Sequence, residues 1–146
     1  ASHEEVVHSA KVSQAYDFIS KKEKEFDEPI GEGGSNVSGG QKQRLSIARA
    51  LVRKPEIYIF DDTFSALDFK TDAKLRKALN ILCQETKSTV LLVAQRISSI
   101  MHAERIVVLD KGEVVGIGNH EELMKSCEVY QEIAYSQLSK EELGNE

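Results

Sequence analysis

Ser38-Gly39-Gly40 stands directly before a predicted helix and has the chemistry of an anion site. The two glycines leave backbone N–H groups sterically open, and the helix dipole adds partial positive charge at that end. The Ser38 hydroxyl adds a further donor. A serine before a helix is also what ordinary capping requires, so this run alone does not establish a phosphate site.

Asp61 and Asp62 follow the apolar run 57–60, which contains two β-branched residues. Such a run is typical of a strand buried on both faces. A carboxylate at the carboxyl end of a buried strand can hold Mg²⁺ through water beside a bound phosphate. Asp61 is therefore a candidate magnesium residue, with the capping of the following turn as its ordinary structural alternative.

The elements that must position these residues are predicted from apolar spacing. A helix is expected over 38–54, where Pro55 ends it, and a second amphipathic helix around 75–82. Residues 89–94 form a second apolar run, typical of another buried strand.

The C-terminal part is predicted to hold a hairpin and helices. The runs 106–109 and 113–117 flank a three-residue loop, Asp110-Lys111-Gly112. Asn119 with Glu122 three residues later predicts a helix start. Helices alternating with buried strands predict an α/β layered fold with a mostly parallel sheet of about four strands.

Composition bounds the class of protein. The chain has 146 residues, 40% hydrophobic and 29% charged, as expected for one globular domain. A net charge of −5 argues against duplex DNA as the main partner. The basic cluster Lys42, Arg44, Arg49, Arg53 and Lys54 is interpreted as a solvated helix face rather than a nucleic-acid site. Cys83 and Cys127 are predicted to be buried free thiols, and no apolar run reaches the roughly 20 residues of a membrane span.

Three motifs in register resemble those of the ABC ATPases. Residues 41–51 resemble the signature helix almost residue for residue, 57–62 resemble the Walker B strand, and Ser65-Ala66-Leu67-Asp68 resembles the D-loop. The similarity covers about residues 29–133. It implies a P-loop NTPase-like, three-layer α/β fold that is incomplete here, because no Gly-x4-Gly-Lys-[Ser/Thr] run is present.

The resemblance also implies a division of the chain. Residues 1–54 would be part of the helical subdomain, with the X-loop and the signature helix. Residues 55–146 would be the C-terminal part of the RecA-like core, with Walker B, the D-loop, the switch region and C-terminal helices. The P-loop, the adenine-stacking aromatic and the Q-loop would precede Ala1, so the chain alone is expected to be inactive.

In this family ATP lies between two domains, on the P-loop of one and under the signature of the other. The resemblance therefore assigns Ser38, Gly39, Gly40 and Gln41 to the ATP of a partner domain. Asp61 would hold Mg²⁺ at the chain's own site, and the D-loop would follow it.

Two positions depart from the family pattern. Asp62 stands where the family usually has the glutamate that polarises the attacking water, and its carboxylate is set back by roughly 1.5 Å. Misplacement of about 1 Å can lower a rate on the order of 100-fold. Gln95 stands where the family has a histidine that contacts the γ-phosphate, and glutamine cannot become cationic. A degenerate site, as in heterodimeric ABC exporters, is expected.

Residues 29–36 look like the exporter-type X-loop, in which Glu32 would lie close to coupling helices of a transmembrane domain. The resemblance thus implies transport-coupled ATP hydrolysis with ATP and Mg²⁺, a second nucleotide-binding domain in a hetero-dimer, and no nucleic acid. The expected place is the cytoplasmic face of a bacterial inner membrane, with this chain itself soluble. The alternatives are a soluble ABC ATPase of DNA repair or chromosome maintenance, which tends to have glutamate in place of Gln41, and a non-catalytic dimerisation module.

Overall fold

The computed structural model describes residues 1–138, and the chain forms two compact units that meet in sequence between Leu91 and Leu92. The first unit contains α1 (His3–Val12), α2 (Tyr16–Ile19), the 3-10 turns η1 (Glu25–Asp27) and η2 (Glu32–Gly34), α3 (Gly39–Leu51), β1 (Ile57–Asp61), α4 (Phe69–Thr86) and the start of β2 (Thr89–Val93). The second unit contains α5 (Ile97–Ile100), β3 (Ile106–Asp110), β4 (Glu113–Gly118), α6 (His120–Ser126) and α7 (Glu128–Gln137).

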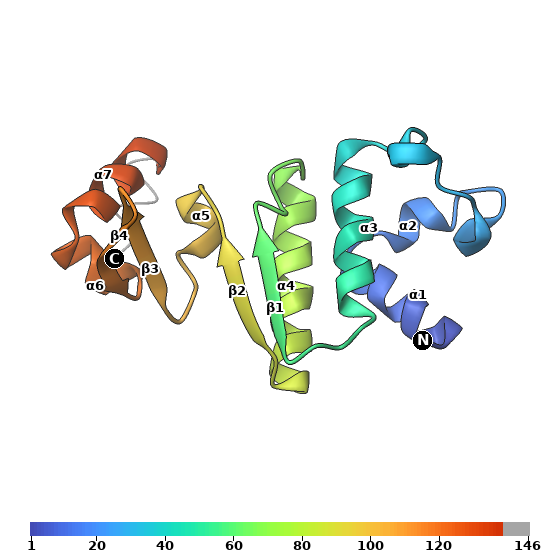
Figure 1. Cartoon of the computed structure of the whole chain (residues 1–146), viewed down its shortest axis with the longest axis horizontal. Helices are drawn as coiled ribbons and strands as arrows, with labels where there is room; N and C mark the ends of the chain where they lie inside the picture. The colour runs from blue at the N-terminus through green and yellow to red at the C-terminus, as the bar shows by residue number, and fades with distance from the viewer. Residues whose placement is uncertain (139–146) are drawn as a thin grey trace. The chain divides into compact units, whose positions relative to one another are not determined.

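In the first unit, α1 begins in a capping box and packs against α3 and α4 (Figure 1). The Ser2 hydroxyl accepts from the Glu5 backbone N–H, and the Glu5 carboxylate accepts from the Ser2 backbone N–H. Ala10 on α1 and Ile47 and Leu51 on α3 are buried. This packing holds α3, the predicted signature helix, by its apolar stripe.

The helix α3 ends earlier than predicted, at Leu51 rather than Lys54. Lys54 has a φ of 48°, in the left-handed region. It stands before Pro55, and a residue before proline is sterically disfavoured in the right-handed helical region. The chain therefore leaves the helix before it reaches β1.

The prediction that β1 is buried on both faces is wrong for the described residues. Tyr58 and Phe60 are buried and stacked, with ring centroids 6.0 Å apart. Burial, together with the neighbouring Cys83 of α4, raises the pKa of Tyr58. Ile57 and Ile59 on the other face are 60% and 67% exposed, because the described chain supplies cover on one face only.

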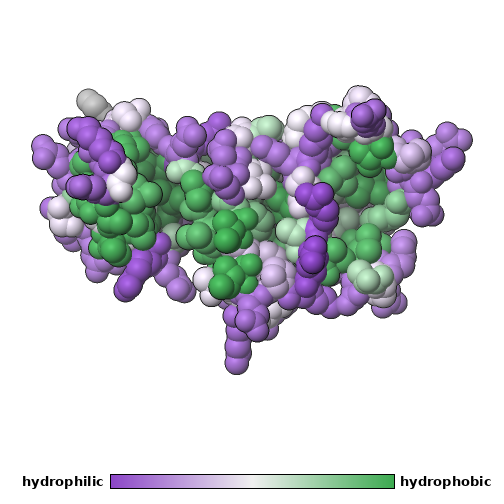
Figure 2. Space-filling view, in the orientation of Figure 1, coloured by the Kyte–Doolittle hydropathy of each residue, from purple (hydrophilic) through white to green (hydrophobic). Residues whose placement is uncertain are grey.

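The strand β2 shares this exposure. It is hydrogen bonded to β1 in a two-stranded sheet, and the two arrows run in the same direction in Figure 1. Val90, Leu91 and Val93 are exposed, so the prediction of a second buried strand is also wrong here. Apolar surface over this sheet is visible in Figure 2.

In the second unit, β3 and β4 form an antiparallel hairpin rather than part of a parallel sheet. Asp110 pairs with Glu113, so the loop has two residues and not the predicted three. Lys111 and Gly112 both have positive φ, which is the geometry of a type I′ turn. The register shifts between Val108 and Leu109, which marks a β-bulge.

The predicted cap of the C-terminal helices is confirmed. Asn119 and Glu122 form a capping box at the start of α6. Behind the hairpin, α6 and α7 close a core made of Ile97, Ile106, Val108, Leu123, Cys127, Tyr130, Ala134 and Leu138. Cys83 and Cys127 are both buried free thiols, as predicted. The mixed order of helices and strands agrees with the expected α/β class.

Candidate functional site

The predicted anion site lies at the first turn of α3. Ser38 is the N-cap residue, and its hydroxyl oxygen accepts from the Gln41 backbone N–H at 3.3 Å. The Gln41 side chain in turn accepts from the Ser38 backbone N–H at 2.9 Å. This capping box fixes the loop while the Ser38 hydroxyl hydrogen stays available for donation.

The two aspartates follow one another at the carboxyl end of β1. Asp61 is its last residue, and Asp62 comes next with a φ of 47°. Both side chains are exposed. The Thr63 hydroxyl donates to the Asp61 carbonyl at 3.2 Å. The chain therefore turns sharply at Asp62. The two carboxylates belong to adjacent residues at the end of the strand.

Asp61 fits the outer-sphere role expected for magnesium. Its exposed carboxylate at a strand end can bind an ion through water. Over residues 1–138 no group of three or more His, Cys, Asp or Glu side chains is placed to hold a metal. Asp61 would therefore be one contributor among phosphate and water oxygens, which is how Mg²⁺ is usually held beside nucleotides.

In residues 65–68, the expected D-loop, two exposed residues lie between buried neighbours. Phe64 and Leu67 are each 8% exposed, whereas Ser65 and Ala66 between them are exposed. Asp68 is the N-cap of α4, where its carboxylate accepts from the Thr71 hydroxyl and backbone N–H. The hydrogen bonds from Thr71 hold the pKa of Asp68 below its ordinary value.

The start of α3, the expected signature helix, is in direct contact with Ser65 and Ala66 of the expected D-loop. A Cβ placed on Gly40 would lie 3.0 Å from the Ala66 carbonyl oxygen, whereas one on Gly39 would lie 3.9 Å from the Ala66 Cβ. The Gln43 side chain bonds to both Ser65 and Ala66. Gln43 was not among the predicted site residues, and nothing in the polar run 41–44 distinguishes it from its neighbours in the sequence.

Gln95 lies in the second unit, in the turn after β2, with its side chain exposed. The Gln137 side chain holds this turn from α7. Its amide nitrogen donates to the Gln95 carbonyl at 2.8 Å, and its amide oxygen accepts from the Ile97 backbone N–H at 2.9 Å. Sequence reasoning missed Gln137 because a bond across 42 residues leaves no local pattern.

Residues 29–36, the expected X-loop, form a loop, as predicted, and contain η2. Glu32 is the first residue of η2 and is exposed. The Asn36 amide closes the loop, accepting from the Gly31 N–H and donating to the Pro29 carbonyl, each at 2.9 Å. Beside it, an apolar cavity of about 230 Å³ opens between α1, η1 and α3, lined by residues that include Phe18, Phe26, Ile30, Val37 and Leu45.

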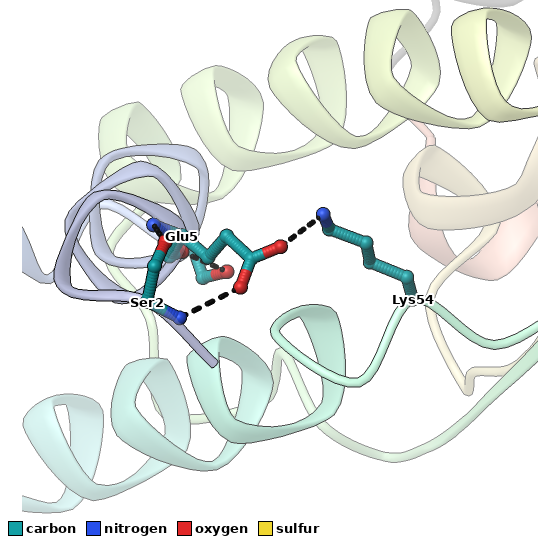
Figure 3. A network of polar contacts seen from close by, with 4 residues as sticks. Ser2, Glu5 and Lys54 are labelled. Carbon is teal, nitrogen blue, oxygen red and sulfur yellow. Dashed lines mark hydrogen bonds and ion pairs between the residues drawn. The ribbon is translucent and has the colours of Figure 1, made fainter.

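The basic cluster is only partly the solvated face that was expected. Arg44 is half-buried: it donates to the Gln14 carbonyl at 2.9 Å and lies over the Phe18 ring at 4.9 Å. Lys54 forms an ion pair with Glu5 at 2.5 Å (Figure 3). Both cations join α3 and its following turn to the N-terminal segment, because a guanidinium and an ammonium can bridge carbonyls and carboxylates.

None of the helices in residues 1–138 is long and apolar enough to cross a membrane.

The chain is similar to known proteins along nearly its whole length. A family model described as "ABC transporter" matches residues 2–65. An uncharacterized ABC transporter ATP-binding protein, YfiB of Bacillus subtilis, is 42% identical over 97% of this chain and 24% of the relative. The leukotoxin export ATP-binding protein LtxB of Aggregatibacter actinomycetemcomitans is 44% identical over 84% of this chain and 17% of the relative.

A solved structure of a bacterial Atm1-family ABC exporter with ATP bound superposes with a TM-score of 0.89 at 35% identity. The superposition covers 96% of this chain and 24% of the exporter chain. The present chain thus spans about a quarter or less of the length of the proteins it matches.

Proposed function

Because the chain belongs to the ATP-binding family of ABC transporters, we propose that it forms part of the nucleotide-binding domain of an exporter. ATP-binding proteins of this family are generally ATPases. In this proposal, ATP binding and hydrolysis at a domain interface drive substrate efflux through an associated transmembrane domain. The similarity to a leukotoxin export ATP-binding protein, and to the solved structure of an exporter, supports this choice over the soluble ABC ATPases.

One observation carries the proposal. The first compact unit contains three features in the order in which the family has them. They are a capped helix start suited to phosphate, a strand end with two carboxylates, and the loop that follows this strand end. The helix start also contacts that loop. The open N–H groups of Gly39 and Gly40 would bind the phosphates of ATP held by a partner domain. Asp61 would bind Mg²⁺ through water at the chain's own site.

The chain's own site would be the weaker one of a hetero-dimer. Asp62 has a side chain one methylene shorter than glutamate and begins from a left-handed backbone, so its carboxylate cannot simply extend further along the strand direction. A general base must reach the proton that it abstracts within hydrogen-bonding distance. Gln95 can donate a hydrogen bond to a phosphate but cannot add positive charge.

The X-loop is proposed as the surface that faces the transmembrane domain, at the cytoplasmic side of the membrane. Glu32 is exposed on a loop closed by its own Asn36 amide, and the apolar cavity beside it is flanked by Ile30 and Val37. A charged residue next to an apolar cavity suits a short amphipathic helix of a partner.

The test compares two substitutions in the complete transporter paired with its partner subunit. A Cβ on Gly39 meets no atom closer than 3.9 Å, so Gly39→Asp places negative charge at the phosphate site with little strain in the chain. We expect it to lower ATP turnover on the order of 100-fold, as does the loss of a phosphate-stabilising group. Asp62→Asn should cause a much smaller loss.

Equal losses from the two substitutions, or a larger loss from Asp62→Asn, would contradict the proposed division of roles. As a control, the 146-residue chain is titrated with Mg-ATP in a calorimeter. We expect no micromolar binding, because this sequence contains no phosphate-binding P-loop.

A further inference from the structure

Gln43 is a half-buried residue on α3 whose side-chain amide bonds to two neighbouring residues of the D-loop. Its Oε1 accepts from the Ala66 backbone N–H at 3.0 Å, and its Nε2 donates to the Ser65 hydroxyl at 3.2 Å. The backbone N–H of Ala66 can only donate, so the amide oxygen must face Ala66 and the amide nitrogen must face Ser65. The orientation of the Gln43 amide is thus set by chemistry.

A third hydrogen bond extends the connection to the end of β1. The Ser65 hydroxyl donates to the Asp62 carbonyl at 3.1 Å while it accepts from Gln43. A hydroxyl that donates and accepts at once joins its two partners in a chain, and each bond in such a chain polarises the next. The side chain of a residue on α3 is thereby connected to the backbone of Asp62.

The D-loop has little else to hold its middle. Ser65 and Ala66 are exposed between the buried side chains of Phe64 and Leu67, so burial fixes the ends of the loop and not its centre. Besides the two bonds from Gln43, this part of the loop has the bonds from the Ser65 backbone N–H and hydroxyl to the Asp62 carbonyl, at 3.5 and 3.1 Å, and the close approach of the Ala66 carbonyl to Gly40. Gln43 supplies the directional bonds at this point.

We propose that Gln43 is a positioning residue that couples the two ATP sites: it ties the loop that would contact the partner's ATP to the backbone of Asp62 at the chain's own site. The proposal rests on the proposed function for the identity of the two sites. A displacement of α3 when its first turn binds phosphate would be transmitted through Gln43 and Ser65 to Asp62. Gln43 itself would touch no nucleotide.

The first measurement needs only the 146-residue chain. Amide hydrogen exchange at Ala66 is compared for the unmodified chain, Gln43→Leu, Gln43→Glu and a control, Ser46→Leu, which places leucine at an exposed position of the same helix. Loss of one hydrogen bond should speed exchange about fivefold in Gln43→Leu. Gln43→Glu keeps an acceptor for Ala66 and should retain the protection, as should Ser46→Leu.

The second measurement uses the complete transporter with its partner. Gln43→Leu should lower kcat on the order of fivefold, while KM for ATP changes by less than about twofold, because Gln43 contacts no nucleotide. In the Ser65→Ala background the same substitution should have a smaller effect on kcat, since the chain of bonds is already broken. Gln43→Glu should recover part of the loss.

Unchanged Ala66 exchange in Gln43→Leu would overturn the proposal, and so would additive effects of Gln43→Leu and Ser65→Ala on kcat. A transporter that hydrolyses no ATP before any substitution would instead refute the proposed function, while the exchange result at Ala66 would still stand on its own. The two failures are therefore distinguishable.

Discussion

At Gly40 the requirement for glycine comes from the chain's own packing as well as from any ligand. A Cβ at this position would lie 3.0 Å from the Ala66 carbonyl oxygen and 3.7 Å from Leu67. Gly39, one residue earlier, has room for a Cβ. The two glycines therefore differ. At Gly40 the D-loop leaves little space for a side chain, whereas at Gly39 only a bound ligand or partner would restrict it.

This difference predicts opposite stability changes for two neighbouring alanine substitutions. Glycine to alanine within a helix usually stabilises by about 0.5–1 kcal/mol, because glycine loses more conformational entropy on folding. Gly39→Ala should show some of that gain. Gly40→Ala should show none, or a net loss, because the Ala66 backbone must move. Urea unfolding of the two variants measures the difference, and an equal gain in both would show that the close approach of Gly40 to the D-loop is wrong.

At the scale of elements, the N-terminal segment holds α3 through a hydrogen bond from Arg44 to Gln14 and an ion pair between Lys54 and Glu5. These two contacts lie on either side of the buried residues of α3. Figure 3 shows one of them, in which Glu5 bonds to Ser2, the N-cap residue of α1, and to Lys54 after α3. The hydrogen bond from the Lys54 ammonium is the main reason that the pKa of Glu5 falls from 4.5 to about 2. The pair is exposed, so added salt should weaken it.

The depressed pKa of Glu5 predicts a pH dependence of stability. Glu5 binds a proton more readily unfolded than folded, so its contribution is present above pH 4.5 and is lost as the pH falls toward about 2. Glu5→Gln should remove this acid-sensitive part, and the difference in unfolding free energy between the two chains should shrink across that window. Glu4→Gln, in the same first helical turn, is the control. A difference that stays constant from pH 5 to about 2 would rule out the ion pair as its source.

Much of the element scale could be predicted from sequence, and the exceptions share a cause. The positions of α3, β1 and the Asn119–Glu122 cap follow from apolar spacing and local capping chemistry. The bonds made by Gln43 and Gln137 could not be predicted, because each joins residues far apart in sequence. The burial of β1 was overpredicted, because an apolar run indicates that both faces of a strand can be buried. It does not indicate which residues bury them.

At the scale of the whole molecule, each of the two units exposes apolar side chains on its strands. In the first unit Ile57, Ile59 and Leu91 are exposed on the β1–β2 sheet, and in the second Val107 and Leu109 are exposed on the hairpin. Exposed apolar patches mark surfaces that contact another protein surface, a ligand or a membrane. This agrees with a chain that spans about a quarter of the length of its relatives.

We propose that this chain contributes an intact signature to its partner while its own hydrolytic site is weakened at Asp62 and Gln95. The most direct measurement is ATP turnover at the chain's own site, in a transporter whose partner subunit has lost its own catalytic carboxylate. The double substitution Asp62→Glu with Gln95→His should raise this turnover at least about tenfold, because it restores the reach of a general base and a group that can become cationic. Turnover that stays unchanged in the double variant would contradict the claim.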